Sequence, residues 1–406
     1  MDQPFSIEEN MRDFDKSILQ QINEDHPRVV ELRRYFHKNP EIAKEEFNTA
    51  KRIEDELDLL GLHHQRVGET GVYSEIKGTL PGERTIVLRA DIDALPIQET
   101  HECEYKSRIP NRMHACGHDS HAASLLGAAK ILCANRDSFG GTIRLCFQQG
   151  EEIGYGARLF VDGGFLDGAH RCFGVHAASN IATGKIAVVP GANNASVDWF
   201  KINVHGAPAH VSTPQLGSDA VYIASQIVVS LQAIITRTIS PMENVLVGIG
   251  KITAGDAYNI VAKSAELEGT VRVFDGKIRK EVRLKMEKLA SNIAESFGGS
   301  VSFEWTDFTS PLVNNPAVSL EVQQTADRVF GAENVIKERT PALGGDDFAE
   351  FILKVPGVYA YFGTGNPEKA ETTASHHDSV FDIDEDGMLT STAIYTFYAL
   401  DFLSGK

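Results

Sequence analysis

The sequence predicts an α/β fold that carries a second, inserted domain. Short apolar runs alternate with segments of helical spacing over most of the 406 residues, which is the pattern of a sheet of buried strands between helices. The middle of the chain instead alternates apolar and polar residues, as half-exposed strands do. Because 406 residues exceed what one hydrophobic core usually spans, we predict two domains, one inserted into the other.

The first part of the predicted catalytic domain, residues 1–194, opens with two helices. In the first helix we expect Asp25 as the N-cap and Pro40 at the end; the second helix stops at Gly61. Apolar runs such as "TIVLRA", "TIRLCFQQ" and "RCFGV" then predict buried strands. Between them lies the helix "SHAASLLGAAKILCA", for which Asp119 is the expected cap.

The inserted domain is predicted at residues 195–304. Its elements follow in the order strand, helix, strand, strand, helix, strand, which predicts a compact split-βαβ unit of the ferredoxin-like kind. The chain then returns to the first domain for residues 305–406.

Most polar residues that could carry chemistry follow a strand-like run. α/β sheets bind ligands beyond the carboxyl ends of their strands, so these residues predict a single site. They are Asp91 and Asp93, Glu151 and Glu152, His176, and the pair His376 and His377.

The densest stretch is "MHACGHDSHA", residues 113–122. Cys116 and His118 are two residues apart and would face the same way on an extended segment, and both are zinc ligands by type. The adjacent Glu151 and Glu152 could divide the roles of general base and metal ligand. Each signal alone also fits an ordinary turn or a hydrogen-bonded core residue, but together they match the inventory of a two-metal site.

Other interpretations stay open at this point. Cys116 could be a nucleophile with His118 or His114 as its base, and the chain could be a binding protein that holds metal without catalysis. Asp91 and Asp93 could bind metal, orient a ligand or cap a turn.

Composition limits the partners and the compartment. A formal net charge of −17 argues against DNA, RNA or an anionic membrane, which attract basic patches. The five cysteines have no paired spacing and the N-terminus lacks the features of a signal peptide, so we expect free thiols in the cytoplasm. The uncharged run 220–236 has helical spacing with polar residues, which predicts a soluble helix.

"MHACGHDSHAASLLGAAKIL" closely resembles the signature of the M20 metallopeptidase family, in its amidohydrolase branch. That branch includes hippurate hydrolases, N-acyl-amino-acid deacylases, aminobenzoyl-glutamate hydrolases and plant auxin-conjugate hydrolases. Further motifs follow in the family's order, among them "LRADIDALPIQE", "FQQGEE", "GVHAASNIATG", "YNIVAKSAELEGTVRVF", "GGDDFA" and "HHDSVFDIDEDG". The resemblance implies a zinc-peptidase-like domain, a mixed twisted sheet flanked by helices, with an inserted lid that often forms a dimer.

The resemblance also implies roles for particular residues. Two divalent ions, usually zinc or manganese and sometimes cobalt or nickel, would be held by Cys116, His118, Glu152, His176 and His377. His377 is preferred to His376 because the family places a phenylalanine, here Phe381, four residues after its ligand.

Glu151 would be the general base. Asp93 would not bind metal itself but would orient one of the metal ligands. In the inserted domain, His210 would reach the scissile carbonyl, frequently across a homodimer, while Asn259 and Arg272 would face the substrate.

The implied activity is hydrolysis of the amide bond of an N-acyl-amino acid, with a metallo-aminopeptidase or dipeptidase as the alternative of the same fold. Several positions depart from the family's pattern. Gln149 and Gly150 replace the frequent Pro-Ala before the glutamate pair, and Ser379 replaces a proline. These changes leave every implied ligand in place, but they do not allow the substrate pocket to be assigned.

Overall fold

The structure is a computed structural model that describes residues 12–405. These residues form two compact units. The first contains the chain up to Gly191, Val313–Thr340 and the residues from Asp347 onward, and the second contains Ala192–Leu312 with Pro341–Asp346. The second unit therefore extends beyond the predicted 195–304 and also takes in the short segment 341–346, which is distant in sequence.

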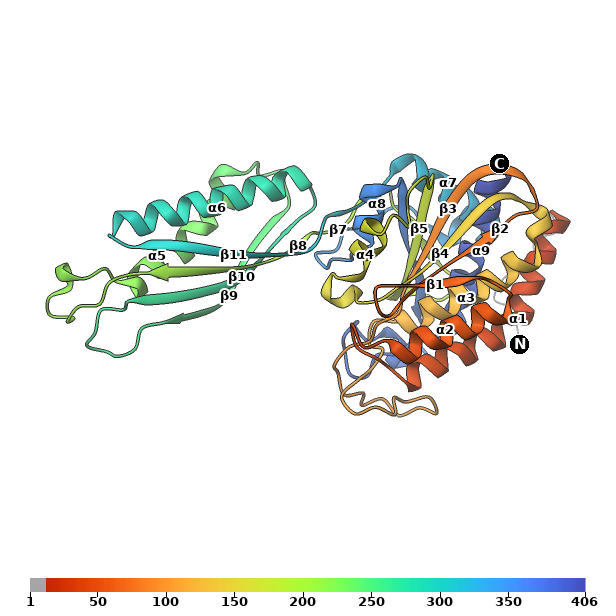
Figure 1. Ribbon diagram of the computed structural model, residues 1–406, viewed down its shortest axis with the longest axis horizontal. Coiled ribbons are helices and arrows are strands. Elements are labelled where there is room, and N and C mark those ends of the chain that lie inside the picture. Colours follow the sequence, from red (N-terminus) through yellow and green to blue (C-terminus); the bar gives the residue numbers. More distant parts are fainter. Residues whose placement is uncertain (1–11, 406) are drawn as a thin grey trace. The chain divides into compact units, whose positions relative to one another are not determined.

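An eight-stranded mixed sheet forms the centre of the first unit (Figure 1). Four neighbouring strands, β4, β3, β5 and β14, run parallel, whereas β1 and β2 are antiparallel additions at one side. In sheet order the strands are β1 (His64–Val67), β2 (Gly71–Lys77), β4 (Gly140–Gln148), β3 (Leu80–Asp91), β5 (Arg171–Ala182), β14 (Gly357–Gly365), β6 (Ile186–Ala187) and β13 (Val335–Ile336). This architecture confirms the predicted α/β class.

Helices cover both faces of this sheet (Figure 1). The helices α3, α7 and α9 lie on one face, with α1 packed outside them, and α4 and α8 lie on the other. Because α3 and α9 are buried on nearly all sides, their apolar residues are spread around the helix instead of forming one stripe. The bounds are α1 (Asp13–Lys38), α2 (Phe47–Leu59), α3 (His118–Ala134), α4 (Gly156–Asp162), α7 (Pro316–Phe330), α8 (Phe348–Lys354) and α9 (Gly387–Ser404).

The expected N-cap at Asp25 is wrong. The first helix begins at Asp13 and passes through Asp25, whose carboxylate pairs with Lys130 of α3. Pro27 also lies inside this helix, where it removes one backbone donor without ending the helix. The helix does end just before Pro40, at Lys38.

The expected cap at Asp119 is also wrong. The N-cap of α3 is Gly117, with a left-handed φ of 89°, and Asp119 lies within the first turn. Its buried carboxylate accepts hydrogen bonds from Arg33 Nε at 2.8 Å and from His37 Nδ1 at 2.7 Å. The carboxylate that we expected to cap the helix locally is instead part of an ion pair with residues distant in sequence.

The second unit is built on a four-stranded antiparallel sheet of order β11-β8-β10-β9 (Figure 1). With a helix after the first and third strands, this is the predicted βαββαβ arrangement. Asp219 and Asp275 cap its two helices by accepting backbone amides. The elements are β8 (Val197–His205), α5 (Ala220–Ala233), β9 (Val245–Ala254), β10 (Ser264–Val273), α6 (Gly276–Ser296) and β11 (Ser300–Thr309). A separate two-stranded sheet pairs β7 (Gly191–Asn194) with β12 (Leu312–Asn314).

One helix among residues 12–405, Ala220–Thr238, is long and apolar enough to cross a membrane by length and composition. Its buried side chains, among them Ile223, Ile227 and Leu231, belong to the core of the second unit, and core helices often have this composition. All five cysteines lie in the described chain and none forms a disulfide. The cytoplasmic location and the lack of a membrane partner stay predictions.

Candidate metal centre

The parallel strands bring two acidic segments together at their carboxyl ends. In register, Asp91 at the end of β3 lies opposite Gln148 at the end of β4. The chain then turns at both places, and Asp93 accepts the backbone amides of Glu151 and Glu152 on its two carboxylate oxygens, at 3.1 and 3.0 Å. Asp93 therefore holds the start of the 3₁₀ turn Glu151–Ile153.

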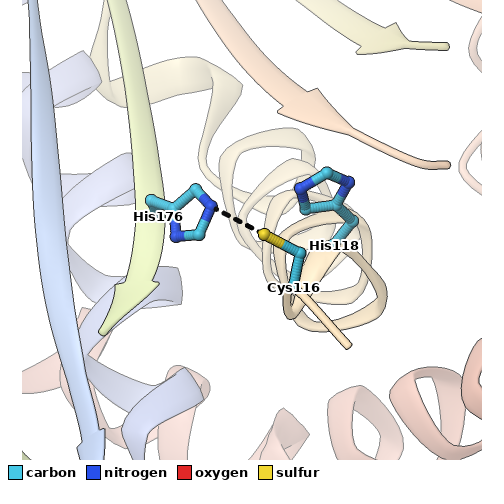
Figure 2. A group of neighbouring side chains, drawn as sticks. All are labelled: Cys116, His118 and His176. Atoms are coloured by element: carbon cyan, nitrogen blue, oxygen red, sulfur yellow. Dashed lines mark hydrogen bonds between the residues drawn. The ribbon is translucent and has the colours of Figure 1, made fainter. Parts of the chain in front are cut away.

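A histidine and a cysteine meet beside this turn. His176 lies within β5, which continues to Ala182, and so it does not follow the strand as expected. Its Nε2 lies 3.5 Å from Cys116 Sγ, and His118 stands next to both (Figure 2). Because His176 Nδ1 donates to the carbonyl of Ala177 at 2.6 Å, the lone pair of Nε2 faces the thiol.

His118 Nε2 and Glu152 Oε1 are buried at this place and make no hydrogen bond with the described residues. They lie 3.9 Å apart, and Glu152 Oε1 is 3.3 Å from His377 Nε2. His118 Nδ1 donates to the carbonyl of Asp93 at 2.9 Å, so Nε2 is the ring nitrogen that faces Glu152. Native proteins rarely leave such atoms unpaired, and a cation would satisfy both.

The donor atoms form overlapping groups, each within 4.8 Å. One group contains Cys116, His118 and His176, another contains Cys116, Glu152 and His377, and a third contains His118, Glu151 and Glu152. Imidazole, thiolate and carboxylate are the zinc ligands of proteins, and overlapping groups suit two neighbouring ions. The structure thus brings together all five residues that the resemblance implied as ligands.

The charges around the cluster also favour a cation. Burial, together with the carboxylates of Glu152 and Glu151, raises the pKa of the Cys116 thiol well above its ordinary value. Burial opposes protonation of His118, but nearby carboxylates, Asp91 first, outweigh it and raise the pKa of this imidazole to about 10. Surplus negative charge therefore surrounds the donors.

The same electrostatics disfavour a nucleophilic cysteine, which requires a lowered pKa. His114, one of the two bases considered for Cys116, is buried, and burial lowers its pKa to about 3. His118, the other base considered, has its pKa raised to about 10, so near neutral pH the ring is already protonated and cannot accept the thiol proton.

Asp91 and His121 form a supporting pair. His121 Nε2 accepts the amide of Ala177 at 2.8 Å, so its proton resides on Nδ1, which donates to Asp91. Both ring nitrogens are thus engaged, and His121 has no lone pair left for a metal. Of the roles left open for Asp91, the structure favours orientation of a neighbouring side chain.

A buried ion-pair network beneath Asp91 was missed by the sequence reasoning. Arg89 is completely buried and donates to Asp91 at 2.6 Å, to Gln148 at 2.8 Å and to Asp347 at 3.0 Å. Gln148 donates in turn to Asp347. The sequence did contain a signal for this network. An arginine lies inside the apolar run "TIVLRA", and a buried arginine needs acidic partners.

The two C-terminal histidines have different surroundings. His377 has a left-handed φ of 68°, its amide donates to the carbonyl of Ala115 at 2.8 Å, and its Nε2 lies 3.3 Å from Glu152. Strained backbone of this kind at a non-glycine residue is concentrated at functional sites. His376 instead packs its ring against Phe381, with centroids 4.8 Å apart, and belongs to none of the donor groups.

The three remaining predicted site residues lie in the second unit. His210 is exposed, and its Nδ1 accepts the amide of Ser212 at 3.1 Å, so the neutral ring carries its proton on Nε2. Arg272 is half-buried and donates to Thr270 Oγ1 at 3.0 Å and to the carbonyl of Leu343 at 3.4 Å. The side chain of Asn259 is exposed.

An α/β sheet with clustered imidazole, thiolate and carboxylate donors, and a second glutamate beside them, defines the class of metal-dependent hydrolases. Residues 87–401 match the model of Peptidase family M20/M25/M40. The chain belongs to this family and is a hydrolase.

Individual relatives cover nearly the whole chain. N-acetylcysteine deacetylase of Bacillus subtilis is 36% identical and covers 92% of this chain and 97% of its own. Thermostable carboxypeptidase 2 of Saccharolobus solfataricus is also 36% identical, over 92% of this chain and 95% of its own. Among solved structures, the Bacillus subtilis YXEP protein, described as a dinuclear metal binding peptidase from the M20 family, is 33% identical with a TM-score of 0.82, over 94% and 99% of the two chains.

The two adjacent histidines provide a matched test of the donor cluster. We expect His377→Ala to lower the metal content of the purified protein, because its ring faces Glu152, and His376→Ala to retain it. Elemental analysis after dialysis against metal-free buffer measures both. Equal metal loss in the two variants would contradict the assignment of His377 to the donor cluster.

Proposed function

We propose that this chain hydrolyses the amide bond of N-acyl-amino acids with two divalent metal ions per subunit. The observation that carries the proposal is the cluster of possible metal ligands around His118 and Glu152, directly beside Glu151, in which His118 Nε2 is buried without a hydrogen-bond partner among the described residues. The likeness to N-acetylcysteine deacetylase supports an acyl group on an amino acid as the substrate class.

The proposed ligands are Cys116, His118, Glu152, His176 and His377. Zinc or manganese would occupy the site, with cobalt or nickel as substitutes, and the cysteine favours zinc because thiolate is a soft ligand. Ions bound there would lower the pKa of a bound water and polarise the substrate carbonyl.

Glu151 is the proposed general base. Its neighbour Glu152 faces the donors, and the amides of both residues are held by Asp93, so the turn presents two carboxylates with separate tasks. Glu151 would take a proton from the attacking water and deliver it to the leaving amine. Asp93 would orient the turn with its carboxylate. Its backbone carbonyl would orient His118 by accepting the hydrogen bond from Nδ1.

Residues of the second unit would bind the substrate. His210 carries its proton on Nε2 and can donate to the carbonyl oxygen as negative charge develops there. Arg272 would pair with the carboxylate of the amino acid, a group that guanidinium binds in a bidentate manner, and Asn259 offers an exposed side-chain amide in the same unit.

A homodimer through the second unit is part of this proposal. Its strand β9 is at the edge of the four-stranded sheet and is largely exposed, and such an edge offers backbone groups to a second copy. Sedimentation velocity would test it, since a monomer at micromolar concentration would exclude the homodimer.

A peptidase activity is the second candidate, because Thermostable carboxypeptidase 2 is equally similar. A panel of N-acetyl-, N-benzoyl- and N-succinyl-amino acids and of dipeptides, assayed with zinc and with manganese, separates the two. We expect turnover of N-acylated substrates that is abolished by a chelator and insensitive to iodoacetamide. Turnover of only those substrates with a free α-amine would refute the deacylase proposal.

The glutamate pair gives a sharper test, because substitution of the two adjacent residues should have different effects, one on kcat and the other on metal content. Glu151→Gln should lower kcat by about 10²- to 10⁴-fold, the usual contribution of a general base, with metal content unchanged. Glu152→Gln should lose metal. Near-normal turnover by Glu151→Gln would remove it as the base.

For the second unit, His210→Ala should lower kcat by about 10²- to 10³-fold, as loss of an oxyanion donor does, and should leave the metal content unchanged. His205→Ala is the matched control, an exposed histidine of the same unit whose ring hydrogen-bonds Ser302 Oγ, and should retain the wild-type rate. If both variants keep the wild-type kcat, His210 has no part in catalysis.

A further inference from the structure

The turn that carries Glu151 and Glu152 is held by more than Asp93. It begins at Gly150, with a left-handed φ of 60°, and its first amides have no partner within the turn itself. Three successive amides point at two carboxylates: that of Gly150 donates to Glu46 Oε1 at 2.9 Å, and those of Glu151 and Glu152 donate to Asp93.

We propose that Glu46 is a positioning residue, which fixes the Glu151–Glu152 turn by accepting the amide of Gly150. Its side chain is completely buried, although it belongs to the N-cap residue of α2. Its second oxygen accepts the hydroxyl of Thr70 at 2.8 Å, so each oxygen of this carboxyl group has a directed partner.

The cost of keeping a carboxylate here supports a specific task. Burial, and then the charge of Asp93, raises the pKa of Glu46 to about 7, so the surroundings oppose ionisation of a carboxyl group at this position. The N-terminus of α2 does not need this side chain, because Glu41 already accepts the amides of Asn48 and Thr49 there.

The segment that contains Glu46 contacts both acidic parts of the site. The carbonyl of Glu41 accepts the amide of Ala94, next to Asp93, at 2.8 Å. At the other end of the turn, the ammonium of Lys44 lies 4.2 Å from the centre of the Tyr155 ring, a cation–π contact, and Lys44 has a left-handed φ of 70°. Residues 41–46 thus brace the turn at its start and at its end.

Three substitutions in the full-length, metal-loaded protein test the role of Glu46. Glu46→Met keeps the length of the side chain but removes both acceptors, whereas Glu46→Gln keeps an amide oxygen for Gly150. Thr70→Val is the matched control, because it removes only the partner of the second oxygen.

We expect Glu46→Met to speed hydrogen exchange at the amides of residues 150–152 by about tenfold, the effect of losing one net hydrogen bond. It should also lower kcat by about 10- to 100-fold, as loss of a supporting partner does, with KM within about threefold. Glu46→Gln and Thr70→Val should stay within about threefold of wild type in both measurements.

The proposal is wrong if Glu46→Met keeps both the wild-type rate of amide hydrogen exchange and the wild-type kcat. An equal loss in Thr70→Val would also overturn it, because that result would show that the carboxylate supports the β1–β2 connection and not the turn. If Glu46→Met does not fold, Glu46→Gln provides the test, because it keeps the acceptor for Gly150. Slower turnover and faster exchange in Glu46→Gln than in Thr70→Val would contradict the proposal. The effect on kcat rests on the proposed role of Glu151, but the exchange at Gly150 does not, so an inactive wild-type protein would leave the positioning test standing.

Discussion

The structure depends on a concentration of buried donors and negative charge that the chain does not satisfy by itself. Among the described residues, His118 Nε2 is buried without a hydrogen-bond partner, and the buried Glu152 Oε1 lies 3.3 Å from His377 Nε2. Burial and carboxylates raise the pKa of Cys116, and carboxylates raise that of His118. Such an arrangement is unfavourable in a folded protein unless a cation compensates it. The need for bound metal thus explains why these residues stand together, and it links the fold to the proposed chemistry.

The parallel part of the sheet explains how distant segments reach one place. Strands β3, β4 and β5 end or pass at the same level, and the turns that follow them carry Asp93 and the glutamate pair. Behind the donors, Arg89 joins Asp91 to Asp347 in a buried network. The donors therefore rest on charged groups whose own partners are satisfied, and this rigidity is what a metal site requires.

Much of this was predictable, and the failures share a physical cause. Periodicity predicted the α/β class and the βαββαβ unit, and the motifs predicted residues that the structure gathers in one cluster. Local capping rules failed at Asp25 and Asp119, because ion pairs with Lys130 and Arg33, distant in sequence, engage those carboxylates. Glu46 gave no local signal, since its role depends on the amide of Gly150, 104 residues away.

The central claim is that the cluster binds two ions and that a thiolate is one of their ligands. Titration of the metal-free protein with cobalt(II), followed by absorption spectroscopy, tests it most directly. We predict saturation at two equivalents per chain, with a thiolate-to-cobalt charge-transfer band in the near ultraviolet that Cys116 supplies. Saturation below one equivalent, or a spectrum without that band, would contradict this account of the site.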